Sequence, residues 1–197
     1  YEGLARFYDD RQAAVTISLD DWADYMLEPI DAATGLLAGL DLPHTVSVIT
    51  GSVGDWSRLQ ARVTTGYTDV AAHTRNHPCT ALDYAALGGY AAQIEGSRAD
   101  LLANLTLPSP YIFAFAQPCG FEDAGVRQAV VAAGFLADRS YVTSPEIGPI
   151  DFAPWQADGA YAPLLPTYVV YVAPGHWEGS GSAADLAEAN AAFDTAY

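Results

Sequence analysis

Hydrophobic and polar positions follow two different periods along this chain, which indicates strands that alternate with helices. Residues 14–20 alternate strictly, with apolar side chains on one face and polar ones on the other, as a half-buried strand does. An amphipathic stretch at about 25–40 follows and predicts a helix. The same succession continues, with further strands expected at 45–50, 69–72, 111–116 and 167–173, and further helices at 55–63, 81–105, 122–133 and 183–196.

Single residues mark where these helices begin, break and end. Asp55 is a suitable N-cap for the second helix, Gly88-Gly89 predicts a break in the long alanine-rich helix, and Gly134 predicts the end of the helix before it. Strands that alternate with helices imply parallel strands joined by crossovers, so the expected fold class is α/β. The length of 197 residues suits one domain, 1–197.

Charge and hydropathy narrow the classes of partner. The chain has 8 basic residues, all of them Arg, against 24 acidic ones, for a formal net charge of -16. A surface this acidic repels phosphate groups, which argues against nucleic-acid binding and against docking on anionic lipid. No stretch approaches the roughly 20 apolar residues of a membrane helix, so no membrane insertion is expected. The oligomeric state is left open.

Polar residues recur where the expected strands end. Asp20 and Asp21, His73, residues 118–120 and His176 each lie at or just after such an end. In open α/β sheets and in barrels, the carboxyl ends of the strands meet on one side, and active sites gather there. The positions therefore predict one site to which all four segments contribute.

Two of these segments carry residues that bind metals. His73 and His77 are four apart on a turn and can direct both rings at one ion, and Asp21 would add a carboxylate oxygen. Three protein ligands leave positions open for water and substrate, as in catalytic sites, and the donor set suits Zn²⁺, with Co²⁺ or Ni²⁺ as alternatives. The plainer interpretations are an Asp-rich turn and two histidines that form separate hydrogen bonds.

The combination of Asp20-Asp21 with His73-Thr-Arg-Asn-His77-Pro78 resembles the polysaccharide deacetylases, the NodB-homology family that is carbohydrate esterase family four. The similarity runs in order from about Val15 to His176. The resemblance implies a distorted (β/α) barrel, an acetylated carbohydrate as substrate, and a secreted or cell-envelope location.

Residue by residue, the resemblance also implies a mechanism. Asp20 would be the general base that takes a proton from water as it attacks the acetyl carbonyl. The backbone N–H of Cys119 would donate to the developing oxyanion, and His176 would protonate the leaving group. The metal ligands would be Asp21, His73 and His77.

The sequence departs from the family pattern in three places. Ala116 stands near the position of the Arg that steadies the base, so Arg75, Gln117 or another residue must orient Asp20. Trp22 replaces a Gly, and the segment around His176 differs from the usual Leu-x-His.

Aromatic residues beside the expected site suggest how a sugar would bind. Trp22 follows the carboxylates and Trp177 follows His176, so both are predicted to offer a ring on which a sugar stacks, with Pro118 as a further substrate contact.

Two questions stay open at this level. Cys79 and Cys119 lie in segments expected to meet, and they are either a disulfide or two free thiols. The chain is either a deacetylase, a catalytically weak or inactive module that binds carbohydrate or metal, or a hydrolase of another ester or amide on the same scaffold.

Overall fold

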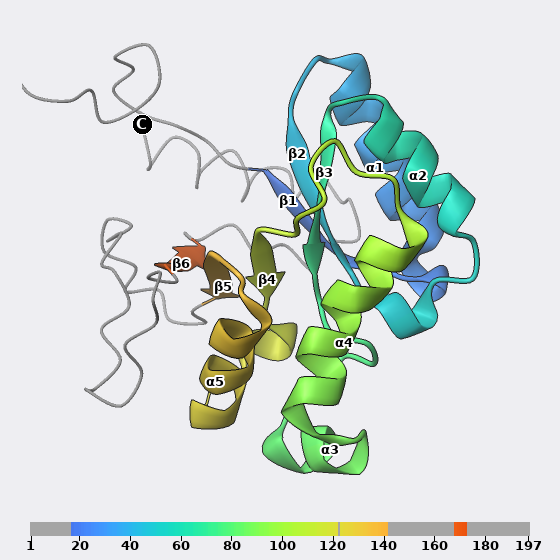
Figure 1. Ribbon diagram of the computed structural model, residues 1–197. Helices are drawn as coiled ribbons and strands as arrows, with labels where there is room; N and C mark the ends of the chain where they lie inside the picture. The colour runs from blue at the N-terminus through green and yellow to red at the C-terminus, as the bar shows by residue number, and fades with distance from the viewer. Residues whose placement is uncertain (1–16, 122, 142–167, 173–197) are drawn as a thin grey trace, which may run out of the picture.

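The structure is a computed structural model that describes residues 17–121, 123–141 and 168–172 (Figure 1). Six strands form one sheet in which every neighbouring pair is parallel and the strand order follows the sequence. Barrels of the (β/α) type have this order, and the described sheet is open between its edge strands, as expected of a distorted barrel. The strands are β1 (Ser18–Trp22), β2 (His44–Val48), β3 (Thr68–Ala72), β4 (Ala114–Ala116), β5 (Ala137–Tyr141) and β6 (Tyr168–Val172).

Helices connect the successive strands from β1 to β5 and lie along the outside of the sheet (Figure 1). Right-handed crossovers between parallel neighbours put consecutive helices on the same face. The α-helices are α1 (Leu27–Gly39), α2 (Trp56–Thr64), α3 (Ala81–Ala86), α4 (Gly89–Asn104) and α5 (Ala124–Ala133). Three short 3₁₀ turns are η2 (Asp24–Met26), η3 (Thr50–Ser52) and η4 (Pro118–Gly120).

The helix ends confirm the predicted N-cap, helix break and helix stop. The Asp55 side chain caps α2 by accepting a hydrogen bond from the Ser57 backbone N–H at 3.0 Å. The predicted break at Gly88-Gly89 separates α3 from α4, and Gly88 has a φ of 93°. Gly134 ends α5 in the left-handed region that glycine adopts without steric cost.

The hydrophobic core lies between the sheet and this helix layer. Strand residues such as Val46, Val70 and Phe115 pack against helix residues such as Leu59 and Ile94, all of them 3% exposed or less. Burial of these apolar faces holds the strands in place against the helices. Because the strands are parallel, the polar residues near their carboxyl ends are held on one side of the sheet.

The element predictions hold with differences at the ends. The structure confirms the α/β class and every predicted helix and strand inside the described residues, but β4 is shorter than the expected 111–116 and β1 runs on to Trp22. Strand β5 was not predicted. The helix expected at 183–196 and the first residues of the strand expected at 14–20 lie outside the described residues. No described helix is long and apolar enough to cross a membrane.

Candidate metal and catalytic site

Asp20 and Asp21 lie inside β1 rather than at its end, and an irregularity directs both toward one place. Successive side chains of a regular strand point to opposite faces. The pairing of β1 with β2 shifts register between Leu19 and Trp22, and Asp21 has a φ of 63°. Such a bulge turns a side chain to a new direction. The two neighbouring carboxylates can therefore face the same site.

The segment from His73 to His77 follows β3 and is held by backbone hydrogen bonds to η3, the turn that follows β2. The N–H of Gly51 donates to the carbonyl of Arg75 at 2.9 Å. A Cβ on Gly51 would stand 2.6 Å from that carbonyl oxygen, so only glycine allows this approach. Thr74 and His77 have φ values of 64° and 57°, and these kinks turn the segment back over the strand end.

Side chains of α4 hold the same segment from the other side. The guanidinium of Arg75 forms two hydrogen bonds of 2.7 Å to the carboxylate of Asp100. Gly96 provides the room, because a Cβ there would lie 2.6 Å from the Arg75 guanidinium carbon. Arg75 is thus engaged with α4, and the expectation that it could orient Asp20 is wrong.

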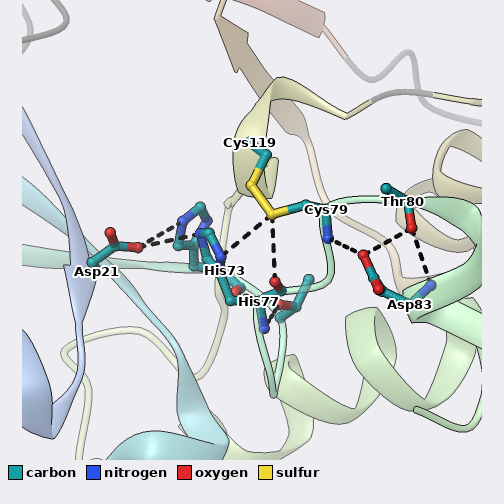
Figure 2. The surroundings of a disulfide bond; sticks show 8 residues. Asp21, His73, His77, Cys79, Thr80, Asp83 and Cys119 are labelled. Atoms are coloured by element: carbon teal, nitrogen blue, oxygen red, sulfur yellow. Dashed lines mark hydrogen bonds and ion pairs between the residues drawn. A yellow bond between two sulfur atoms is a disulfide. The ribbon is translucent and has the colours of Figure 1, made fainter. Parts of the chain in front are cut away.

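The three predicted metal ligands meet. The Oδ1 atom of Asp21 lies 3.3 Å from Nε2 of His73 and 3.4 Å from Nε2 of His77. Figure 2 shows the Asp21 carboxylate directed toward both imidazole rings. These ligand atoms all lie within 4.8 Å of one another. The other ring nitrogen of His73, Nδ1, donates a hydrogen bond of 2.7 Å to the carbonyl oxygen of Ala116. That bond leaves Nε2 with a free lone pair directed at the cluster.

The cluster fits a divalent ion. Donors about 2.0–2.1 Å from a tetrahedral zinc stand roughly 3.3–3.4 Å apart, which is the separation of the Asp21 oxygen from each of the two imidazole nitrogens. Asp21 Oδ1 is also a buried oxygen without a hydrogen-bond partner among the described residues. Burial, and then the neighbouring imidazole of His73, lower the pKa of His77, which favours the neutral imidazole, the form that binds metals.

Asp20 pairs with an arginine that the sequence did not reveal. Arg139 of β5 donates a hydrogen bond to Oδ1 of Asp20, and the same NH2 group lies 3.5 Å from the hydroxyl oxygen of Ser47. Burial raises the pKa of Asp20, but the charge of Arg139, the nearby His73 and the hydrogen bond from Arg139 outweigh it, so the pKa lies below its ordinary value. Asp20 is therefore ionised at neutral pH, as a base must be.

The segment after β4 completes the group. Gln117 does not orient Asp20, because its amide donates instead to the buried carboxylate of Asp138 at 2.7 Å. Cys119 has a φ of 55° and is bonded through its sulfur to Cys79, which settles the open question in favour of a disulfide. The pairing places the segment 117–120 directly beside the histidine segment (Figure 2).

Two substrate contacts expected from the sequence need correction. Trp22 is 1% exposed and belongs to the core, so it cannot offer a face to a sugar. The bulge at Asp21 interrupts the alternation, and Trp22 packs inward instead of beside the carboxylates. Pro118 is buried as well. His176 and Trp177 lie outside the described residues, so their roles stay predictions.

An aromatic residue that the sequence reasoning overlooked lies close to the carboxylates. The side chain of Tyr25 is 64% exposed, and burial and then the charge of Asp21 raise its pKa.

Comparison with known proteins places the fold. No protein-family model and no curated protein matches the chain. Solved structures do: a Mycobacterium smegmatis protein provisionally classed as a polysaccharide deacetylase matches with a TM-score of 0.62 at 15% identity, over 91% of this chain and 72% of that one. IcaB from Ammonifex degensii matches with a TM-score of 0.53 at 21% sequence identity, over 64% of this chain and 58% of that one. The family 4 carbohydrate esterase from Streptomyces lividans, in complex with acetate, matches with a TM-score of 0.52 at 18% identity, over 64% of this chain and 62% of that one.

These likenesses establish that the chain has the fold of the polysaccharide deacetylases, as the sequence motifs implied. The match spans less than two thirds of the length of IcaB and of the Streptomyces esterase. The fold alone does not assign chemistry, which has to come from the residues of this site.

The cluster predicts zinc binding that depends on Asp21 and not on its neighbour. In competition with a chromophoric chelator, we expect one Zn²⁺ per chain, and a loss of affinity in Asp21→Ala larger than the roughly 10–100-fold caused by loss of an outer-shell partner. Asp20→Asn is the matched control, because it alters the adjacent carboxylate and leaves all three ligands. Equal affinity in wild type and Asp21→Ala would contradict the ligand assignment.

Proposed function

We propose that this chain, which has the polysaccharide deacetylase fold, is a metal-dependent hydrolase that removes an N-acetyl or O-acetyl group from a carbohydrate polymer or oligomer. The observation that carries the proposal is the meeting of Asp21 Oδ1 with the Nε2 atoms of His73 and His77, beside an ionised carboxylate on Asp20. A bound divalent ion supplies Lewis acidity toward the acetyl carbonyl and toward water. We expect Zn²⁺, with Co²⁺ or Ni²⁺ as alternatives.

Asp20 acts as the general base. Its carboxylate accepts the proton of the attacking water, which requires an ionised side chain held at a fixed orientation. Arg139 provides both conditions, because its guanidinium bonds to Oδ1 and lowers the pKa of Asp20. Arg139 comes from β5 and takes the place of the Arg that the family pattern puts near Ala116.

The remaining roles follow from the segments after β4 and β6. The backbone N–H of Cys119 is the proposed donor to the oxyanion, since η4 lies beside the histidine segment to which Cys119 is bonded. His176 is the proposed acid that protonates the leaving amine or alkoxide, and Trp177 is a proposed stacking residue. A backbone donor does not depend on the side chain, so a cysteine is compatible with the role.

Two observations support an acetylated carbohydrate in particular. The Streptomyces esterase of similar fold was solved with acetate, the product of such a reaction. The exposed ring of Tyr25 near Asp21 offers the apolar face on which a sugar ring stacks, in place of the buried Trp22.

The disulfide suits an oxidising compartment, which supports a secreted or cell-envelope location.

Asp20→Asn tests the assignment of the base. We expect acetate release from acetylated oligosaccharides to fall by about 10²–10⁴-fold, the contribution of a general base, while zinc affinity stays unchanged. Acetate release with zinc, cobalt or nickel restored after chelation measures the metal requirement in the same assay.

The competing functions predict different results. If wild type and Asp20→Asn both bind zinc and are equally inert on sugars, the chain is a binding module rather than an enzyme. If acetate release is confined to non-sugar esters or amides, it is a hydrolase of another substrate class.

Arg139→Met tests how Asp20 is held. We expect kcat/KM to fall about 100-fold, as misplacement of a reacting group by about 1 Å does. Loss of the arginine raises the pKa of Asp20, so the acidic limb of the pH–rate profile moves to higher pH, because the base is lost as pH falls through that pKa. Arg139→Lys should restore the position of the limb in part.

Arg58→Met is the charge control for this variant. It removes an arginine that pairs with Glu28 and Asp31 on the outer helices, so we expect the pH profile to stay where it is. An unshifted acidic limb in Arg139→Met would show that the arginine does not act on the base.

Tyr25→Ala tests the sugar platform. We expect KM for an acetylated oligosaccharide to rise about 2- to 10-fold with little change in kcat, since stacking of this kind contributes about 0.5–1.5 kcal/mol. Tyr25→Phe keeps the ring and should retain the wild-type KM. Equal KM values in all three proteins would remove Tyr25 from the substrate site.

A further inference from the structure

The disulfide between Cys79 and Cys119 joins the two segments on which the proposed chemistry depends. Cys79 lies two residues after His77, and Cys119 lies in η4 after β4. Their Cα atoms are 5.3 Å apart, within the usual range for such a bond. One covalent bond therefore connects the segment of a metal ligand to the segment of the expected oxyanion donor (Figure 2).

The disulfide also touches the metal ligand directly. The Sγ atom of Cys79 lies 3.8 Å from Nδ1 of His77, on the side of the ring away from Asp21. A disulfide sulfur carries no proton and can only accept, so it favours the tautomer of His77 with the proton on Nδ1 and the lone pair on Nε2. Groups in this outer position normally orient a ligating imidazole and tune its basicity.

The end of β4 and the turn after it are connected to the histidine segment at two points. The carbonyl oxygen of Ala116, the last residue of β4, accepts the hydrogen bond from His73 Nδ1 at 2.7 Å, and Cys119 in η4 is bonded to Cys79, two residues after His77. Cys79 is fixed in turn at the start of α3, because its backbone N–H donates to the Asp83 carboxylate at 3.2 Å. Cutting the disulfide leaves the hydrogen bond at His73 and removes the tie at His77.

We propose that the Cys79–Cys119 disulfide is a redox-sensitive positioning element of this site, and that its reduction weakens metal binding and slows turnover. The part of the proposal that concerns turnover rests on the proposed deacetylase function. Cys119 is exposed, so a reductant can reach the bond from solvent. A phosphine gives two electrons to the S–S bond and becomes a phosphine oxide with oxygen from water, and each sulfur gains a proton from water.

The experiment compares zinc affinity and kinetics before and after reduction by a water-soluble phosphine. The chain has only two cysteines, so the reductant acts on this bond alone. We expect zinc affinity to fall about 10-fold or more, in the range for loss of an outer partner, and kcat to fall while KM changes little. Reoxidation should restore both.

The double variant Cys79→Ser/Cys119→Ser is the matched control. It should resemble the reduced wild type and should not respond to the reductant, and Cys79→Ala/Cys119→Ala serves if the serine pair fails to fold. Thermal unfolding is measured alongside. Suppose that the melting temperature falls but that zinc affinity and kcat, measured well below the melting temperature, do not change. The disulfide would then be an ordinary structural bond, and the proposal would be overturned.

A change in metal stoichiometry is a second way to contradict it. His77, Cys79 and Cys119 form another cluster of potential ligands, so two zinc ions per reduced chain would mean that the freed thiols bind their own ion. The proposed function fails separately, if oxidised protein with zinc bound releases no acetate. In that case the difference in zinc affinity between the two redox states still decides the proposal.

Discussion

Repulsion between the neighbouring carboxylates of Asp20 and Asp21 is the constraint around which this site is built. Two adjacent carboxylates share one end of the sheet with two imidazoles, and Asp21 Oδ1 lies only 3.3 and 3.4 Å from their nitrogens. Such a group is costly unless positive charge lies within it. Arg139 supplies that charge to Asp20, and a divalent ion would supply it to Asp21. In the proposed function, this division leaves the Asp20 carboxylate free to accept a proton and assigns the Asp21 carboxylate to metal binding.

The parallel sheet makes this arrangement possible. β1 brings the carboxylates, the segment after β3 brings the histidines, the last residue of β4 brings the hydrogen-bond partner of His73, and β5 brings the arginine. Because the strands are neighbours in sequence order, their ends form a continuous edge, and each element is fixed by a core on its other side. The disulfide adds a covalent tie across this edge, at the place where two long segments meet without strand pairing.

The sequence predicted what depends on local pattern. Alternation located the strands, and the spacing of His73 and His77 after a strand identified them as candidate ligands, whose side chains the structure brings together with Asp21. Strand β5 was missed because Ala137–Tyr141 is short and polar, and its charges are stabilised by partners far away, Asp20 for Arg139 and Gln117 for Asp138. A strand due after the Gly134 helix stop was the available signal. Trp22 was misplaced because a bulge leaves no mark in a single sequence.

X-ray absorption at the zinc edge of the zinc-loaded, oxidised protein distinguishes this set of ligands from any other. With Asp21, His73 and His77 as ligands, the spectrum should show a shell of nitrogen and oxygen donors at about 2.0–2.1 Å, with the multiple-scattering signature of two imidazoles. Sulfur at about 2.3 Å, or a shell without imidazole, would place the ion elsewhere and rule out these three residues as its ligands.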